Sequence, residues 1–160
     1  MRYRLVVVAA PAHPLARLQA IPLRALAAHD WLVGSSGVDP SSDVGQILAH
    51  LHLPASRLRV FPSEALAWTA AADGEGVAPA VAHVVAREVE RGALVHLPVE
   101  GTPLDRFWYA GSVPLDRCSP AATKFRRFLG TPDAMQVMHR ANASVPSSRF
   151  RPPVYVTLWS

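Results

Sequence analysis

The chain has 160 residues, half of them apolar, which is enough for one ordinary domain or two small lobes with a buried core. Its longest apolar run, Leu5 to Ala12, is interrupted by Pro11 and is too short to span a bilayer, and no cleavable export signal is recognised before it. The single cysteine, Cys118, excludes an internal disulfide and a cysteine-based metal site. These features predict a non-secreted, cytoplasmic protein without a membrane segment.

The formal net charge of +4 is unevenly distributed. Residues 116–151 hold seven cations against two acids, Asp116 and Asp133, so the whole excess lies near the C-terminus. A basic face there could meet phosphate. The solvated side of a helix is the simpler interpretation of such a run.

Strand and helix patterns alternate through the first half of the chain. In chain order they predict a strand over 5–10, a short helix from Pro22, a strand over 31–33, a loop over 34–40, a helix over 44–51 capped by Ser41, Ser42 or Asp43, a strand over 57–61, and a helix from the capping Ser63 to Gly74.

The second half continues in the same way. Its patterns predict a helix from Pro79 to Gly92, strands over 94–99 and 106–110, helices capped by Ser119 and Thr131, and a strand over 154–159. The alternation favours an α/β fold with a largely parallel sheet. Ligands of such folds lie beyond the carboxyl ends of the strands, here at 34–39, 61–63 and 74–79.

The loop Gly74-Glu75-Gly76 invites comparison with nucleotide-binding motifs. The dinucleotide fingerprint needs a third glycine where Pro79 stands, and a phosphate-binding Walker loop needs a lysine, but the first lysine of the chain is Lys124. Nucleotide binding by this loop is therefore not expected. The role of Glu75 stays open.

Metal and catalytic motifs are equally weak. His50 and His52 are the only close histidine pair, and two residues two positions apart on a helix point about 200° apart, which disfavours a shared metal ion. The candidate nucleophiles Ser35, Ser36, Ser63 and Cys118 lack a surrounding nucleophile elbow or an identifiable general base. We predict no metal, no cofactor and no catalytic residue. Serine hydroxyls and amides at helix N-termini instead suit a small anion.

Five pieces of the chain, in order, resemble the second half of the effector-binding domain of LysR-type transcriptional regulators. They are Leu5-Val6-Val7-Val8 with Ala12-His13-Pro14-Leu15-Ala16, the Leu23/Leu26 to Trp31 spacing, Ala71-Ala72-x-Gly74-x-Gly76-Val77-Ala78, Glu90-Arg91-Gly92-Ala93-Leu94-Val95-His96-Leu97, and Ser119-Pro120-Ala121-Ala122 with Phe125 and Phe128-Leu129.

The resemblance implies a fold like that of type II periplasmic binding proteins, with one complete Rossmann-like lobe and part of a second lobe. It implies an effector-binding domain over 1–139, in which 13–92 is the second regulatory lobe, 4–12 and 93–98 are hinge crossings, and 99–139 is the returning part of the first lobe. Residues 140–160 form a C-terminal tail. Glu75 and the early Pro79 depart from the family pattern.

The same resemblance implies that the chain senses a small, anionic effector in a cleft between the lobes. One wall would consist of Ser35, Ser36, Phe61, Ser63 and Val77. DNA binding would belong to a helix-turn-helix that is not part of this chain, and a homo-oligomer is expected. Two other hypotheses remain: a solute-binding or enzymatic protein on the same fold, and an interaction module that completes its first lobe by pairing with another chain.

Overall fold

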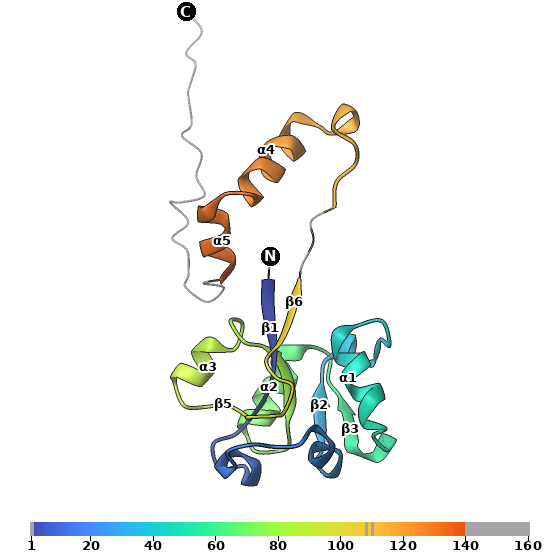
Figure 1. Ribbon diagram of the computed structural model, residues 1–160, viewed down its shortest axis with the longest axis vertical. Coiled ribbons are helices and arrows are strands. Elements are labelled where there is room, and N and C mark those ends of the chain that lie inside the picture. Colours follow the sequence, from blue (N-terminus) through green and yellow to red (C-terminus); the bar gives the residue numbers. More distant parts are fainter. Residues whose placement is uncertain (1, 108, 110, 140–160) are drawn as a thin grey trace, which may run out of the picture. The chain divides into compact units, whose positions relative to one another are not determined.

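The computed structural model describes residues 2–107, 109 and 111–139, and the chain divides into two compact units. Unit 1 comprises residues 1–109, with all six strands and helices α1 to α3, and unit 2 comprises residues 110–160, with α4 and α5 (Figure 1). The lobe and hinge boundaries implied by the family resemblance stay predictions. The predicted strand over 154–159 lies outside the described residues.

The sheet of unit 1 is organised around its first strand, β1. This strand pairs antiparallel with three others: β1 is Arg2–Ala9, and its partners are β4 (Ala78–Val81), β5 (Val95–His96) and β6 (Leu104–Phe107). The first half of β1 pairs with β6, and its apolar second half pairs with β4 and β5. The β-branched run of β1 is buried as predicted.

Two short strands form a parallel pair beside this sheet: β2 is Trp31–Val33 and β3 is Leu58–Val60. A parallel bridge between Trp31 and Val77 connects β2 to the segment that leads into β4. The α/β class is confirmed, but the expectation of a largely parallel sheet is wrong, because every strand paired with β1 runs against it. Hydrophobic patterns locate strands without giving their direction.

The helices of unit 1 follow the predicted caps. They are α1 (Asp43–Leu51), α2 (Glu64–Ala72) and α3 (Ala86–Glu90), with single turns η1 (Pro14–Arg17), η2 (Leu23–Ala28), η3 (Ser35–Val38) and η4 (Ala55–Arg57). Ser42 caps α1 by accepting a hydrogen bond from the Gly45 N–H at 2.8 Å. Ser63 caps α2 by accepting one from the Leu66 N–H at 3.4 Å.

The predicted helix from Pro79 to Gly92 is wrong in its first half. Ala78–Val81 is strand β4, and only Ala86–Glu90 is helical. Pro79 lies opposite Val7 in the ladder, where its carbonyl accepts a hydrogen bond from the Trp68 indole at 3.0 Å. A short run of small apolar residues fits either a strand or a buried helix, and pairing with β1 decided the outcome. Gly92 does follow the helix with a positive φ of 71°.

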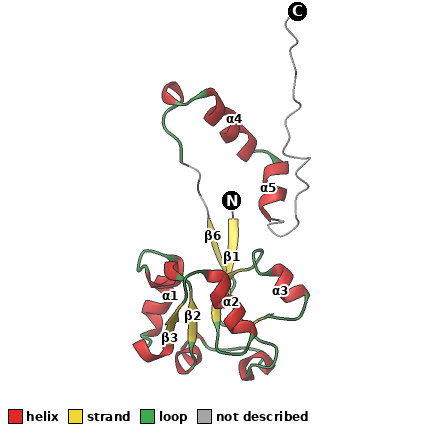
Figure 2. Ribbon diagram, turned by 180° about the vertical axis from the view of Figure 1, so that it is seen from behind, coloured by secondary structure: helices red, strands yellow, loops and turns green. Residues whose placement is uncertain are grey.

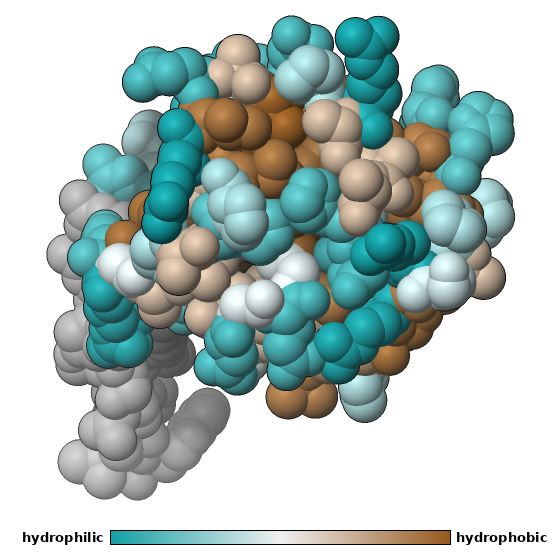
Figure 3. Space-filling model, turned by 90° about the horizontal axis from the view of Figure 1, so that it is seen from below, coloured by the Kyte–Doolittle hydropathy of each residue, from teal (hydrophilic) through white to brown (hydrophobic). Residues whose placement is uncertain are grey.

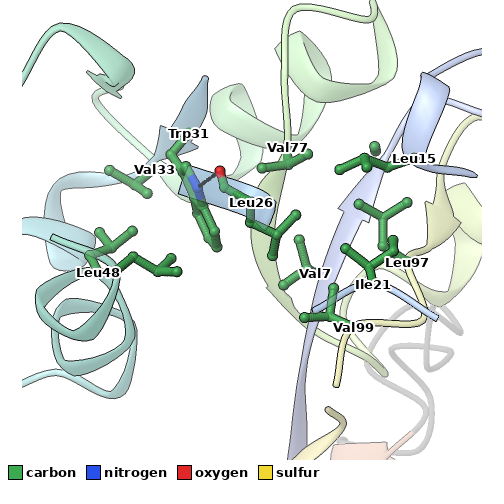
Figure 4. Close-up of a cluster of buried hydrophobic side chains, with 12 residues drawn as sticks. Val7, Leu15, Ile21, Leu26, Trp31, Val33, Leu48, Val77, Leu97 and Val99 are labelled. Atoms are coloured by element: carbon green, nitrogen blue, oxygen red, sulfur yellow. Dashed lines mark hydrogen bonds between the residues drawn. The ribbon is translucent and has the colours of Figure 1, made fainter. Parts of the chain in front are cut away.

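Two apolar clusters cover opposite faces of the sheet, because neighbouring residues of a strand point to opposite sides. Val7 and Trp31 belong to one cluster, which α1 covers with Leu48 and Leu51. Val8 belongs to the other cluster, which α2 covers with its alanines. Figure 4 shows the first cluster, in which the buried Trp31 indole donates a hydrogen bond to the Leu26 carbonyl at 3.0 Å. Figure 2 shows α1 and α2 beside the strands.

Unit 2 contains the single turn η5 (Leu115–Arg117) and helices α4 (Pro120–Leu129) and α5 (Pro132–His139). As predicted, Ser119 caps α4 and the Thr131 hydroxyl accepts from an amide in the first turn of α5. Phe125 and Phe128, expected to form an apolar stripe, are 61% and 43% exposed.

None of the described helices has the length and apolar character that a membrane crossing requires. In the view from below the orientation of Figure 1, polar side chains separate the apolar areas of the surface (Figure 3).

Candidate functional site

The candidate site lies where β2 and β3 end. Since these strands are parallel, their carboxyl ends meet at one edge of the sheet. Ser35 begins η3 directly after β2, and Phe61 and Ser63 follow β3. The Phe61 N–H donates to the Val33 carbonyl at 2.8 Å, which aligns the two strand ends. The structure thus places three of the predicted wall residues along this edge.

A close approach at Gly34 joins the η3 loop to the start of α2. A methyl group added at Gly34 would lie 2.6 Å from Cδ and 2.7 Å from the backbone nitrogen of Glu64. Any side chain at this position would therefore displace the helix start. Because Ser35 follows Gly34 and Ser63 precedes Glu64, the two predicted serines belong to one continuous wall. Sequence reasoning missed Glu64, whose carboxyl group stands over the strand end.

The predicted wall residues differ in what they expose. Ser35 is exposed, and Phe61 and Ser63 are half-buried. The Arg59 guanidinium lies over the Phe61 ring, 5.3 Å from its centroid, so this aromatic face already has a cation partner. The side chain of Ser36 lies outside what the structure describes.

Val77 has a structural role instead. Its side chain is completely buried in the core cluster of Trp31. Its N–H donates to the Asp30 carbonyl and its carbonyl accepts from the Leu32 N–H, both at 2.9 Å. We therefore leave Val77 out of the candidate wall, as a residue that supports β2 from behind.

The start of α1 forms the next part of the edge. A methyl group added at Gly45 would lie only 2.0 Å from the Asp39 carbonyl oxygen, so the first turn of α1 rests directly on the loop that follows η3. The Ser41 hydroxyl and N–H both donate to the Asp39 carboxylate, and these bonds lower the pKa of Asp39. The loop from Ser35 to Ser42 is thereby fixed at both ends.

One carboxylate gathers two further strands at this edge. Asp43, the first residue of α1, accepts a hydrogen bond from the Tyr3 hydroxyl of β1 and an ionic hydrogen bond from Arg106 Nε of β6 at 2.8 Å. Sequence reasoning considered Asp43 only as a helix cap and missed Tyr3 and Arg106. The missing information was the β1–β6 register, which places these two residues opposite each other.

The other sequence candidates lie apart from this edge in chemistry. Cys118 Sγ donates to the Val113 carbonyl at 3.3 Å, and His50 Nδ1 contacts the Gln46 carbonyl oxygen at 2.7 Å. In the described part of the chain, no three or more His, Cys, Asp or Glu side chains are grouped as metal ligands would be.

Comparison with known proteins places this architecture in a family. The LysR substrate binding domain family matches residues 1–131. The chain therefore belongs to that family, and the resemblance noted in its sequence is confirmed.

The curated relatives are regulators. An HTH-type transcriptional regulator of Mycobacterium tuberculosis, Rv0377, is 34% identical over 163 aligned residues, which cover 100% of this chain and 49% of the relative. The RuBisCO operon transcriptional regulator of Allochromatium vinosum is 34% identical over 132 residues, which cover 78% of this chain and 41% of the relative. The chain spans about half the length of the curated relatives that it matches.

Solved structures of regulatory domains share the fold. The Synechocystis CcmR regulatory domain in complex with 2-PG has a TM-score of 0.67 and 25% identity, over 81% of this chain and 62% of that one. The effector-binding domain of QuiR in complex with shikimate has a TM-score of 0.62 and 22% identity, over 79% and 59% of the two chains.

Proposed function

We propose that this chain is the effector-sensing portion of a LysR-type transcriptional regulator and that it binds a small anionic molecule at the edge formed by Ser35, Phe61 and Ser63. The observation that carries this proposal is the close approach of the α2 start to Gly34, which brings two serine hydroxyls and a helix N-terminus into one wall. Helix N-termini favour anions because their amides point outward and the helix dipole is positive there.

Glu64 refines the kind of anion. Its carboxyl group stands beside Gly34 at the same edge, so the wall offers an acceptor as well as donors. A bare dianion would meet this negative charge, whereas an anion with hydroxyl groups could donate to it. We therefore favour a hydroxylated carboxylate or phosphate, and the solved relatives hold 2-PG and shikimate.

The wider roles are proposals as well. The relatives are HTH-type regulators of about twice this length, which supports DNA binding through a part of the protein not represented in this chain, a cytoplasmic location and a homo-oligomer. We propose no catalytic or cofactor-dependent role. Signalling would follow from a shift between conformations that bind the effector differently, without a chemical step.

The test is a thermal-shift screen of the 160-residue chain against 2-PG, shikimate and related small carboxylates. A binding compound should raise the unfolding temperature. Ser35→Ala and Ser63→Ala should each reduce that shift. Ser119→Ala removes an equivalent helix cap from α4 and controls for the loss of stability alone. Unchanged shifts in both wall variants would reject the site.

A further inference from the structure

A single carboxylate connects three elements of unit 1. Tyr3 of β1 and Arg106 of β6 are directly opposite each other in the antiparallel ladder. The Tyr3 hydroxyl donates to one oxygen of Asp43 and Arg106 Nε donates to the other. Asp43 thus receives one hydrogen bond from each strand of the pair.

The environment of this contact favours a substantial interaction. The side chains of Arg106 and Asp43 are 34% and 29% exposed, so solvent screens them less than a surface pair. Both bonds to the carboxylate are of the kind that is stronger than a neutral hydrogen bond, because the acceptor is ionised. By contrast, Arg2 and Asp105 of the same strand pair lie 3.8 Å apart with 66% and 54% exposure.

Asp43 is also firmly joined to the candidate wall. The Ser42 N–H donates to the Asp39 carbonyl at 3.0 Å, and the Gly45 backbone lies against the same carbonyl. No space separates the first turn of α1 from the loop after η3. A displacement of that loop therefore has to move Asp43, because close-packed segments cannot be compressed independently.

The strand pair held by Asp43 has a particular position in the chain. β6 is the last strand before unit 2, which begins at residue 110. The β1–β6 pair is thus the part of the described unit 1 sheet next to the connection between the units. A change in its geometry is a change at that connection.

We propose that Asp43 is a positioning residue that couples the candidate effector wall to the β1–β6 strand pair. The inference rests on the proposed function for the identity of the wall. When the loop from Ser35 to Asp39 changes on effector binding, Asp43 transmits the change to Tyr3 and Arg106. The physical basis is a contiguous set of contacts, and coupling through it is reciprocal.

A purely local role makes a different prediction. An aspartate in the first turn of a helix stabilises that helix through the dipole alone. In that case the loss of the charge would loosen α1 and leave the strand pair unchanged. The two roles are therefore separable by measuring each segment individually.

The experiment is hydrogen–deuterium exchange of the full 160-residue chain without ligand, read separately for residues 2–5, 35–46 and 104–107. Asp43→Asn should speed exchange in 2–5 and 104–107 by about tenfold, since a hydrogen bond to a charged group is lost there. Asp105→Asn, which breaks only the exposed pair, should change these segments by less than about twofold.

The reciprocal variant tests the coupling itself. Arg106→Gln, on the strand side, should speed exchange in 35–46 as well as in the strands. Tyr3→Phe removes one hydrogen bond without cutting the side chain back, so it serves if Asp43→Asn does not fold, and it should give the same pattern with a smaller amplitude. Faster exchange confined to α1 in Asp43→Asn, or to the strands in Arg106→Gln and Tyr3→Phe, would overturn the proposal.

These measurements need no effector. Failure of the ligand screen would therefore reject the proposed site while leaving the exchange result intact. Failure of the exchange experiment would reject the coupling while leaving the site intact.

Discussion

The Glu75 carboxylate lies 2.6 Å from the Arg59 guanidinium, and this ion pair joins the loop between Gly74 and Gly76 to strand β3. The same guanidinium lies over the Phe61 ring. Glu75, the acidic departure from the family pattern, thus helps to hold the cation that covers one residue of the candidate wall.

The Arg59–Glu75 pair should add little to stability. Its side chains are 49% and 41% exposed, so water and salt screen the interaction, and Glu75→Gln should cost at most about 1 kcal/mol in urea unfolding. Glu100→Gln is the matched control, because the described part of the chain gives Glu100 no ion pair. A cost of several kcal/mol for Glu75→Gln alone would contradict this interpretation.

Gly45→Ala should destabilise unit 1 although alanine favours helices. The added methyl group would lie 2.0 Å from the Asp39 carbonyl oxygen, which is backbone and cannot move aside cheaply. Overpacking of this kind costs about 1–3 kcal/mol, more than the gain of about 1 kcal/mol in helix propensity. The neighbouring exposed Gln46→Ala should stay within about 0.5 kcal/mol in the same urea titration. Equal effects would show that α1 does not rest on Asp39.

Trp31→Phe should lower the free energy of unfolding by about 2–4 kcal/mol. The indole is fully buried, and its loss leaves a cavity and removes the donor to the Leu26 carbonyl. Trp68→Phe, at a half-buried tryptophan with a similar hydrogen bond to Pro79, should cost less. The reverse order in chemical denaturation would contradict the core assignment.

Acidification should destabilise the fold through His13. Burial, together with the nearby His29 whose ring centroid lies 5.2 Å away, lowers the pKa of His13 below its ordinary 6.5. The unfolded chain therefore binds a proton that the folded chain resists. Stability is unaffected well above pH 6.5 and falls as the pH drops below 6.5. His13 Nδ1 also accepts from the Leu15 N–H, a bond that protonation at that nitrogen would break.

His13→Asn should reduce this pH dependence, because asparagine does not titrate and can still accept the capping hydrogen bond. The measurement is the urea midpoint between pH 7.5 and 5. Burial and Arg4 also lower the pKa of His96, so His13→Asn should flatten the curve only in part and the double variant with His96→Asn further. A His13→Asn curve parallel to that of the wild type would refute the role of His13.

Much of the fold could be predicted from local signals. Capping serines located the starts of α1, α2 and α4, since each hydroxyl accepts from an amide in the first turn. The segment Ala78–Val81 was mistaken for a helix because its small apolar residues carry no period that separates the two structures. Strand direction failed for a related reason: it depends on partners distant in sequence.

The candidate site divides in the same way. Ser35 and Ser63 follow strand ends, which a pattern of strands locates. Val77 was included by its place in the loop, but its side chain faces the core. Tyr3 and Arg106 could not be found, because they come together only through the register of β1 and β6 and meet at a carboxylate of α1.

The central claim is that a small hydroxylated anion binds where β2 and β3 end. Its most direct test is a titration of the isotopically labelled 160-residue chain with shikimate and with 2-PG, followed by amide nuclear magnetic resonance spectra. The account predicts saturable shifts at Gly34, Ser35 and the first turn of α2, with small changes in α3. Saturable shifts that leave these wall amides unmoved, or no saturable shift with either compound, would contradict it.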